Sequence, residues 1–125
     1  YKRVENNPKF KIFPSLRFEY FLVLLKNAQF AIGNSSAGIR EAPYYNIPTI
    51  NLGNRQNNRV KSKNIISIDI EMQKIISSIN LALSFEKLPR DIDFGDGNSD
   101  KKFLKLLQTK ELWKVSKQKQ FKDLT

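Results

Sequence analysis

Residues 31–59 read AIGNSSAGIREAPYYNIPTINLGNRQNNR, and this stretch decides the fold that the sequence predicts. Its first apolar run breaks at Gly33, and the hydroxyl pair Ser35 and Ser36 follows. Its second apolar run, residues 48–52, breaks at Gly53 and leads into a polar loop with two arginines. Parallel sheets bind ligands outside the carboxyl ends of their strands. We therefore expect both loops at one ligand-binding edge.

Predicted strands and helices alternate on both sides of this stretch. Strands are expected at residues 10–13, 29–32, 48–52 and 64–68, and helices at 17–27, 36–44, 71–85, 99–108 and from about 111 to 124. The helix at 71–85 is predicted from an apolar stripe of Met72, Ile75, Ile76, Ile79 and Leu83. Such alternation favours a parallel sheet with right-handed crossovers. We predict an α/β fold of three layers for residues 1–125, as one domain or a piece of one.

The sequence contains neither Cys nor His, and this limits the catalytic and metal-binding sites that it can form. Without Cys there is neither a disulfide framework nor a thiolate metal site. Without His the chain lacks the commonest acid–base group near neutral pH and a self-contained catalytic triad, and a zinc site is not expected. No apolar run approaches the ~20 residues of a membrane span, and no secretory signal is visible. We expect a cytoplasmic protein without membrane contact.

The net charge of +10 is concentrated near the carboxyl terminus. Residues 101–125 hold eight lysines against Glu111 and Asp123, which gives this tail a charge of +6. A basic tail is compatible with nucleic-acid binding. We favour a solvated lysine-rich helix face instead, because the tail has only Trp113 and Phe121 as aromatic residues and no nucleic-acid motif.

The first polar loop has the residue types of a phosphate site. Ser35 and Ser36 precede a predicted helix, whose N-terminal amides and dipole would attract an anion. Gly38 would let a phosphate approach closely. Helix capping by Asn34, Ser35 or Ser36 explains the same pattern and is the commoner arrangement. The loop is neither a Walker loop nor GxGxxG.

The following residues add a carboxylate and two guanidinium groups. Glu41 would repel a phosphate but accept hydrogen bonds from a ribose diol; an ion pair with Arg40 or Arg55 is the alternative. Arg55 and Arg59 lie in the second loop, and arginine makes bidentate contacts with phosphate oxygens. Surface solubility is the alternative for both arginines. Together, these groups at adjacent strand ends favour a pocket for a nucleoside diphosphate.

The same residues resemble a known enzyme family. Residues 13–59, FPSLRFEYFLVLLKNAQFAIGNSSAGIREAPYYNIPTINLGNRQNNR, are similar to the hydrolysing UDP-N-acetylglucosamine 2-epimerases of sialic-acid-type sugar biosynthesis. Residues 94–98 (FGDGN) and 118–121 (QKQF) resemble the carboxyl-terminal region of that family. The resemblance spans about residues 8–123. It implies the carboxyl-terminal half of a glycosyltransferase-B-like fold, in which a Rossmann-like domain binds UDP in a cleft with an N-terminal domain that this chain lacks.

The resemblance also implies roles for single residues. The implied UDP contacts are Phe21, Ser35, Ser36, Glu41 and Arg55, with Ser15, Gly38 and Arg59 as second-rank contacts. The serines would bind the diphosphate, the carboxylate the ribose hydroxyls, and Arg55 the phosphates. Phe21 takes the place of an aromatic ring that the wider family stacks on uracil. No cofactor and no metal are implied.

By the same resemblance, the reaction eliminates UDP from C1 of the sugar to give a glycal, and water then adds to release N-acetylmannosamine. The acid–base carboxylates of the family lie in its first domain, and its functional His lies upstream in the second, whereas this chain has no His. We therefore assign no catalytic residue and predict that the chain alone does not turn over substrate. The family suggests UDP or a UDP-sugar, the first domain and a second copy in a homodimer as partners.

Other hypotheses stay open. One is a related nucleotide-sugar epimerase, either non-hydrolysing or of another specificity such as legionaminic-type sugars. Non-hydrolysing members usually lack the second serine of the motif, so Ser36 favours hydrolysis. A basic binder of nucleic acid or of an anionic surface would instead bind with an affinity that falls steeply with salt. A truncated chain that folds without any activity is a further possibility.

Overall fold

The computed structural model of the chain describes residues 3–86, 88–116 and 118. It divides into two compact units, Tyr1–Asp93 and Phe94–Thr125. The elements of the first unit are α1 (Phe18–Lys26), β1 (Ala31–Gly33), α2 (Ala37–Arg40), the 3-10 helix η1 (Pro43–Tyr45), β2 (Thr49–Leu52), β3 (Ile65–Ile68) and α3 (Met72–Ser84). Those of the second unit are α4 (Ser99–Leu107) and α5 (Lys110–Trp113).

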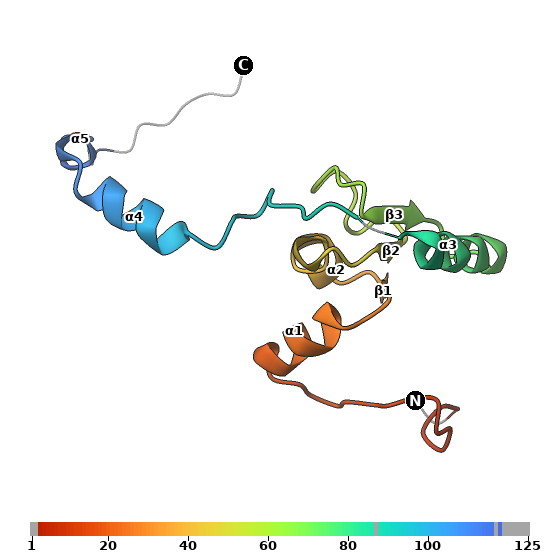
Figure 1. Cartoon of the computed structure of the whole chain (residues 1–125). Helices are drawn as coiled ribbons and strands as arrows, with labels where there is room; N and C mark the ends of the chain where they lie inside the picture. Colours follow the sequence, from red (N-terminus) through yellow and green to blue (C-terminus); the bar gives the residue numbers. More distant parts are fainter. Residues whose placement is uncertain (1–2, 87, 117, 119–125) are drawn as a thin grey trace. The chain divides into compact units, whose positions relative to one another are not determined.

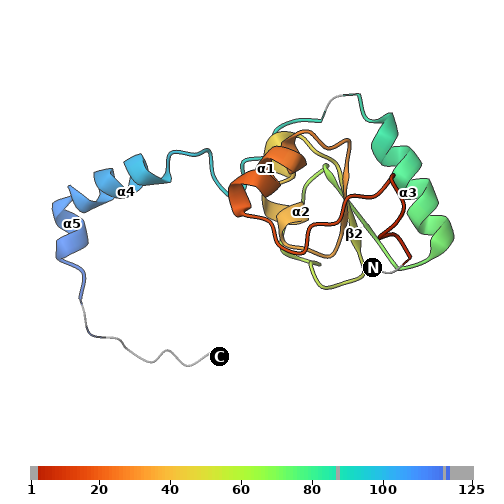
Figure 2. The ribbon, with the colours of Figure 1, turned by 90° about the horizontal axis from the view of Figure 1, so that it is seen from below.

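The strands of the first unit form one parallel sheet in the order β1-β2-β3 (Figure 1). The register places Gly33 opposite Asn51, and Asn51 opposite Ser67. In Figure 2, α1 and α2 lie on one side of β2 and α3 lies on the other. The predicted α/β class with a parallel sheet and flanking helices is confirmed, and the carboxyl ends of all three strands lie at one edge.

The apolar core joins α1 to the segment that leads into β2. Leu25, Ala42 and Ile47 are buried together, and the residues packed against them are Phe21, Ala28, Ala31 and Tyr45. Ile50, in the middle of β2, is completely buried. Burial of one such side chain stabilises a fold by about 1.5–3 kcal/mol. The core therefore includes residues on both sides of the first polar loop, with Ala31 before it and Ala42 after it.

The predicted strand at residues 10–13 is wrong. This segment has no strand assignment, and Phe10 and Phe13 expose 56% and 43% of their surface. The described sheet holds β1, β2 and β3 alone, so the segment has no neighbouring strand to share hydrogen bonds with. An apolar run without a partner strand does not form a stable strand by itself.

Two details of the predicted helices also differ. The helix expected at 36–44 divides into α2 and η1, because Pro43 has no amide hydrogen with which to continue an α-helix. The N-cap position of α1 is held by Arg17, which makes no side-chain capping bond, and the nearest serine, Ser15, does not cap this helix. A residue that caps by its side chain must directly precede the first turn, and Ser15 stands too early.

The buried face of α3 matches the predicted apolar stripe only in part: Ile75 and Ile79 are half-buried, as predicted, and share this face with two small residues. Ser78 and Ala82 are the buried residues of this helix, and Met72 and Ile76 expose 71% and 48% of their surface. Leu83 is exposed as well. Small side chains let a helix axis lie close to a sheet, and α3 therefore packs on β2 and β3 through Ser78 and Ala82 together with Ile75 and Ile79.

In the second unit, α4 confirms the predicted helix at 99–108. The described part of α5 ends at Trp113, so no helix runs on through residues 114–116. The remainder of the helix or tail predicted from about 111 to 124, and most of the segment 118–121, lie outside the described residues. Phe103 and Trp113 are 61% and 68% exposed.

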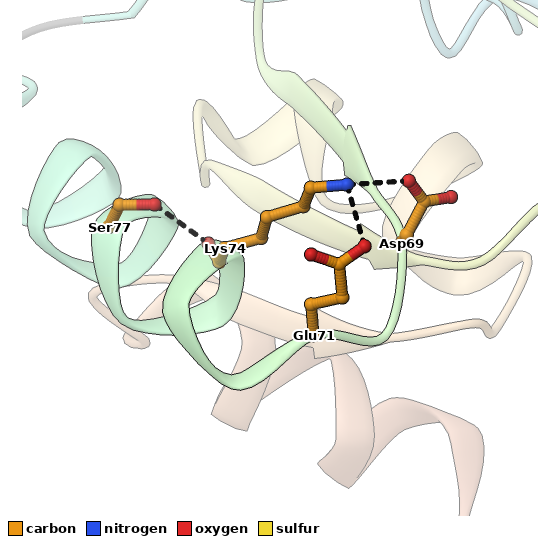
Figure 3. Close-up of polar contacts among 4 residues, drawn as sticks. All are labelled: Asp69, Glu71, Lys74 and Ser77. Carbon is orange, nitrogen blue, oxygen red and sulfur yellow. Dashed lines mark hydrogen bonds and ion pairs between the residues drawn. The ribbon is translucent and has the colours of Figure 1, made fainter.

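A charged cluster lies at the N-terminal end of α3 (Figure 3). Lys74 Nζ donates to Asp69 Oδ2 at 2.8 Å and to Glu71 Oε1 at 2.9 Å. The hydrogen bond from Lys74, and then its positive charge, lower the pKa of Asp69. Hydrogen bonds to Asp69 and then to Glu71 raise the pKa of Lys74. Because all three side chains are exposed, solvent screens these pairs and their contribution to stability is small.

Candidate functional site

The candidate site lies where β1 and β2 end. β1 ends at Gly33 and is followed by the first loop, residues 34–36; β2 ends at Leu52 and is followed by the second loop, residues 53–59. Gly53 has a φ of +73°, which glycine adopts without strain, and its amide donates to the carbonyl of Ile68 at 2.8 Å. Because β1 and β2 are parallel neighbours, both loops leave the same edge of the sheet. This is the placement that the sequence predicts.

A side chain joins the two loops directly. Gln56 Nε2 donates to the backbone carbonyl of Asn34 at 2.8 Å, although the two residues are 22 positions apart. Gln56 is only 4% exposed. The contact holds the first loop against the second, so the hydroxyls of one and the arginines of the other belong to one surface.

Asn51 stabilises the same edge of the sheet through hydrogen bonds of its side chain. It is 1% exposed, and its Nδ2 donates to Ser67 Oγ at 3.2 Å and to the carbonyl of Gly53 at 3.4 Å. These bonds tie the end of β2 to β3 and to the start of the second loop. The sequence alone predicts no role for Asn51 or Gln56. Two positions could have drawn attention to them: Asn51 is an amide inside the apolar strand run Thr49–Leu52, and Gln56 is an amide beside Arg55.

A cavity of about 140 Å³ lies beside the first loop. It is lined by Phe21, Leu25, Ala31, Ile32, Gly33, Ser35, Ala37, Gly38 and Thr49. The structure thus brings together Phe21, Ser35 and Gly38 among the predicted residues. Pockets for small molecules usually measure roughly 300–1,000 Å³. This cavity can hold one ring or one phosphate group, and a whole nucleotide would have to extend beyond it.

The two serines differ in how they are used. Ser35 Oγ accepts a hydrogen bond from the amide of Ala37, the first residue of α2, at 3.3 Å, although Ser35 does not hold the N-cap position itself. Ser36 occupies the N-cap position of α2, but its side chain makes no capping bond. Both residues are exposed. Because α2 has only four residues, its dipole is that of a single turn, and any anion here would rely on hydroxyls and amides more than on the dipole expected from a longer helix.

Gly38 has a structural role in addition to the predicted one. It is buried, and a Cβ added to it would stand 2.6 Å from Thr49 Cγ2. Its amide donates to the carbonyl of Ser35 at 3.2 Å. Glycine at this position therefore lets α2 lie close to β2, which sets the height of the serines above the sheet. A contact between Gly38 and a phosphate stays a prediction.

Glu41 carries an unsatisfied carboxylate oxygen. The residue is half-buried at the C-cap of α2, and its Oε2 is buried without a hydrogen-bond partner among the described residues. Within the described ranges Glu41 forms no ion pair with Arg55, so that alternative partner is not supported, and an ion pair with Arg40 stays an alternative. A buried carboxylate oxygen without a donor costs free energy. Such a group is suited to accept a hydrogen bond from a ligand hydroxyl.

The remaining predicted residues lie on the surface. Arg55 and Arg59 are exposed in the second loop, and Ser15 is exposed in the segment before α1. These three, with Ser36 and Glu41, are not among the residues that line the small cavity. The arginines lie at the correct strand end for a phosphate, and the structure gives Ser15 no contact with the site.

Two other kinds of feature are not found in the described part of the chain. No group of three His, Cys, Asp or Glu side chains there is placed to hold a metal ion. None of its helices is long and apolar enough to cross a membrane. The two loops at the sheet edge remain the place where chemically useful groups converge.

The fold and these loops define a Rossmann-like α/β domain with a candidate anion- and hydroxyl-binding edge. The model of the UDP-N-acetylglucosamine 2-epimerase family matches residues 1–108. The chain belongs to this family. It is 50% identical over 119 residues to a UDP-N-acetylglucosamine 2-epimerase of Neisseria meningitidis serogroup B, a match that covers 93% of this chain and 32% of that protein.

Two further comparisons extend this result. The chain is 34% identical over 104 residues to the UDP-N,N'-diacetylbacillosamine 2-epimerase (hydrolyzing) of Legionella pneumophila, covering 83% of this chain and 28% of that protein. Its fold matches the crystal structure of Methanocaldococcus jannaschii UDP-GlcNAc 2-epimerase in complex with UDP-GlcNAc and UDP, with a TM-score of 0.69 and 24% identity over 85% of this chain and 30% of that chain. The chain therefore spans about a third of the length of the curated relatives that it matches.

Proposed function

We propose that this chain is the UDP-binding, carboxyl-terminal part of a hydrolysing UDP-N-acetylglucosamine 2-epimerase. The whole enzyme would convert UDP-N-acetylglucosamine and water to N-acetylmannosamine and UDP, for sialic-acid-type sugar biosynthesis in the cytoplasm. The observation that carries the proposal is the 50% identity over 119 residues to a protein named UDP-N-acetylglucosamine 2-epimerase. The Legionella relative, which is named as hydrolysing, supports the hydrolytic form of the reaction.

The proposed UDP contacts are Phe21, Ser35, Ser36, Glu41 and Arg55, with Ser15, Gly38 and Arg59 as secondary contacts. The exposed hydroxyls of Ser35 and Ser36 would donate to the diphosphate, and Arg55 would neutralise its charge. The unsatisfied Oε2 of Glu41 supports its assignment to the ribose hydroxyls. The ring of Phe21, in the wall of the small cavity, is available to stack on a base.

The proposal includes partners outside this chain. An N-terminal domain would complete the cleft and supply the groups that transfer protons, and two copies of the whole enzyme would form a homodimer. Stabilising the developing charge on the leaving diphosphate would be the part that this chain plays in catalysis. No metal or cofactor is needed for that part.

A related specificity is the second candidate. The Legionella relative is named for UDP-N,N'-diacetylbacillosamine, a different sugar on the same nucleotide. The UDP contacts proposed here would be the same for both sugars, so nucleotide binding cannot distinguish the two candidate specificities. Offering both UDP-sugars to one enzyme and comparing their turnover would distinguish them. A non-hydrolysing reaction would release UDP-N-acetylmannosamine instead of the free sugar.

Titration calorimetry with UDP tests the nucleotide site. We expect heat of binding for the unchanged chain, none for Arg55→Ala and a weaker signal for Ser35→Ala, while uridine, which has no phosphate, should bind poorly in every case. Glu111→Ala in α5 is the matched surface control and should bind UDP normally. Absence of any signal with millimolar UDP would count against a complete nucleotide site on this chain.

The salt dependence of binding distinguishes a UDP site at the sheet edge from the alternative, a basic binder of nucleic acid or of an anionic surface. That alternative predicts binding that depends on the lysines of residues 101–122 and weakens steeply with salt. Neutralising Lys101, Lys102 and Lys105 should leave UDP affinity unchanged if the site lies at the sheet edge. A parallel loss of UDP binding and nucleic-acid binding in this variant would favour the basic tail.

A further inference from the structure

Gln56 occupies an unusual place between the two loops. Its side chain is buried, with 4% of its surface exposed, yet it belongs to a loop in which Asn54, Arg55, Asn57 and Asn58 are all exposed. Its Nε2 donates to the carbonyl of Asn34 at 2.8 Å. The side-chain amide of Gln56 is therefore shielded from water and forms a hydrogen bond with one specific protein group instead.

The bond joins the direct neighbours of two proposed ligand groups. Asn34 precedes Ser35, and Gln56 follows Arg55. A single peptide unit separates the hydrogen-bonded residue from the candidate phosphate group on each side. This hydrogen bond therefore limits how far the backbones of Ser35 and Arg55 can move apart.

Packing alone does not account for a glutamine here. The Oε1 atom of Gln56 is buried and has no hydrogen-bond partner among the described residues. A buried acceptor without a donor is destabilising, and an apolar side chain of the same shape would avoid this cost. What glutamine adds is the donor that reaches the carbonyl of Asn34.

We propose that Gln56 is a positioning residue that holds the loop of Ser35 and the loop of Arg55 at the spacing a diphosphate requires. This inference rests on the UDP-binding function proposed above. Gln56 touches no phosphate itself; it acts through its hydrogen bond to Asn34. Without that bond, binding UDP would first have to order two independent loops, and the affinity would fall by that cost.

Gln56→Met is the decisive variant, because methionine fills a similar volume, cannot donate, and removes the unsatisfied Oε1. In the full 125-residue chain, free of nucleotide, we expect the NMR order parameters of the Ser35 and Ser36 amides to fall from about 0.85 to below about 0.6. The affinity for UDP should fall about tenfold. The melting temperature should stay the same or rise, because the variant loses a buried unsatisfied acceptor. Asn57→Ala, at the exposed neighbouring position, should change none of these quantities.

The outcomes separate this inference from the proposed function. Unchanged order parameters in Gln56→Met, or an unchanged UDP affinity, would overturn the positioning role. A fall in melting temperature that parallels the loss of affinity would also overturn it, because Gln56 would then merely support the fold. An unchanged chain that fails to bind UDP would count against the proposed function, while the order parameters measured without nucleotide would still decide whether Gln56 holds the loops together.

Discussion

Gly38 lies directly against Thr49, so that a Cβ added at residue 38 would stand 2.6 Å from Thr49 Cγ2. This contact sets how closely α2 approaches β2, and α2 begins immediately after the two candidate serines. The Rossmann-like sheet of this family member therefore positions its first loop through a packing contact between backbone and methyl group.

The first prediction uses this contact. Gly38→Ala should destabilise the chain by about 1–3 kcal/mol, because one of two packed groups must shift. Thr49→Ser removes Cγ2, and the next atoms, Oγ1 and Cβ, lie at 3.6 and 3.7 Å, which is ordinary contact. The double variant should therefore recover most of the loss in urea unfolding. Strictly additive losses would mean that the methyl group is not what the added Cβ meets.

A second prediction concerns Asn64, which is 1% exposed. Its Nδ2 donates to the carbonyl of Pro89 at 3.0 Å and to that of Pro43 at 3.4 Å, and so ties the segment after α3 to η1. Asn64→Ala should lower the free energy of unfolding by about 1–3 kcal/mol, because the chain loses a buried side chain together with both of its hydrogen bonds. Asn80→Ala, exposed on α3, is the control and should stay within about 0.5 kcal/mol of the unchanged chain. Equal effects of the two substitutions would contradict this account.

These polar bridges mark the limit of what the sequence could predict. The alternation of apolar runs and glycine-led loops correctly indicated β1, β2 and β3, because burial periodicity is a local property. Which side chain joins two loops is not local: Gln56 and Asn34 are 22 residues apart, and no spacing rule connects them. The segment 10–13 failed for the same reason, since its apolar run forms a strand only beside another strand, and nothing local supplies one.

The third prediction is a pH dependence at the start of α3. Because Lys74 lowers the pKa of Asp69, this pair stabilises the fold above the ordinary Asp value of 3.8 and loses its effect as the pH falls through the lowered pKa. The raised pKa of Lys74 keeps its positive charge up to and beyond the ordinary value of 10.5. The small stability difference between the unchanged chain and Lys74→Met should therefore be present at pH 7 and decrease as the pH falls below 3.8. Added salt should reduce it at pH 7. A difference that stays constant as the pH falls below 3.8 would show that Lys74 acts by packing.

The fourth prediction tests the role proposed for Glu41. If its unsatisfied Oε2 accepts from the ribose, the unchanged chain should bind UDP at least about tenfold more tightly than 2′,3′-dideoxy-UDP, since a hydrogen bond to a charged group is worth about 1.5–3 kcal/mol. Glu41→Ala should remove this preference and leave binding of the dideoxy nucleotide nearly unchanged. Calorimetry with both nucleotides measures it. A preference that survives in Glu41→Ala would assign the ribose to another residue.

The last prediction concerns catalysis by this chain alone. The chain has no His, and the carboxylate best placed at the candidate site, Glu41, is assigned to the ribose. Without a group that can move a proton at C2 of the sugar, UDP cannot be eliminated, however well its phosphates are held. UDP-N-acetylglucosamine incubated with the chain should therefore release no UDP above a heat-inactivated sample, in a preparation whose UDP binding has been confirmed. The Neisseria relative, of which this chain matches 32%, serves as the positive control for release of UDP in the same assay. Release of UDP by the chain above the heat-inactivated level would place a proton-transfer group within residues 1–125 and reopen the assignment of Glu41.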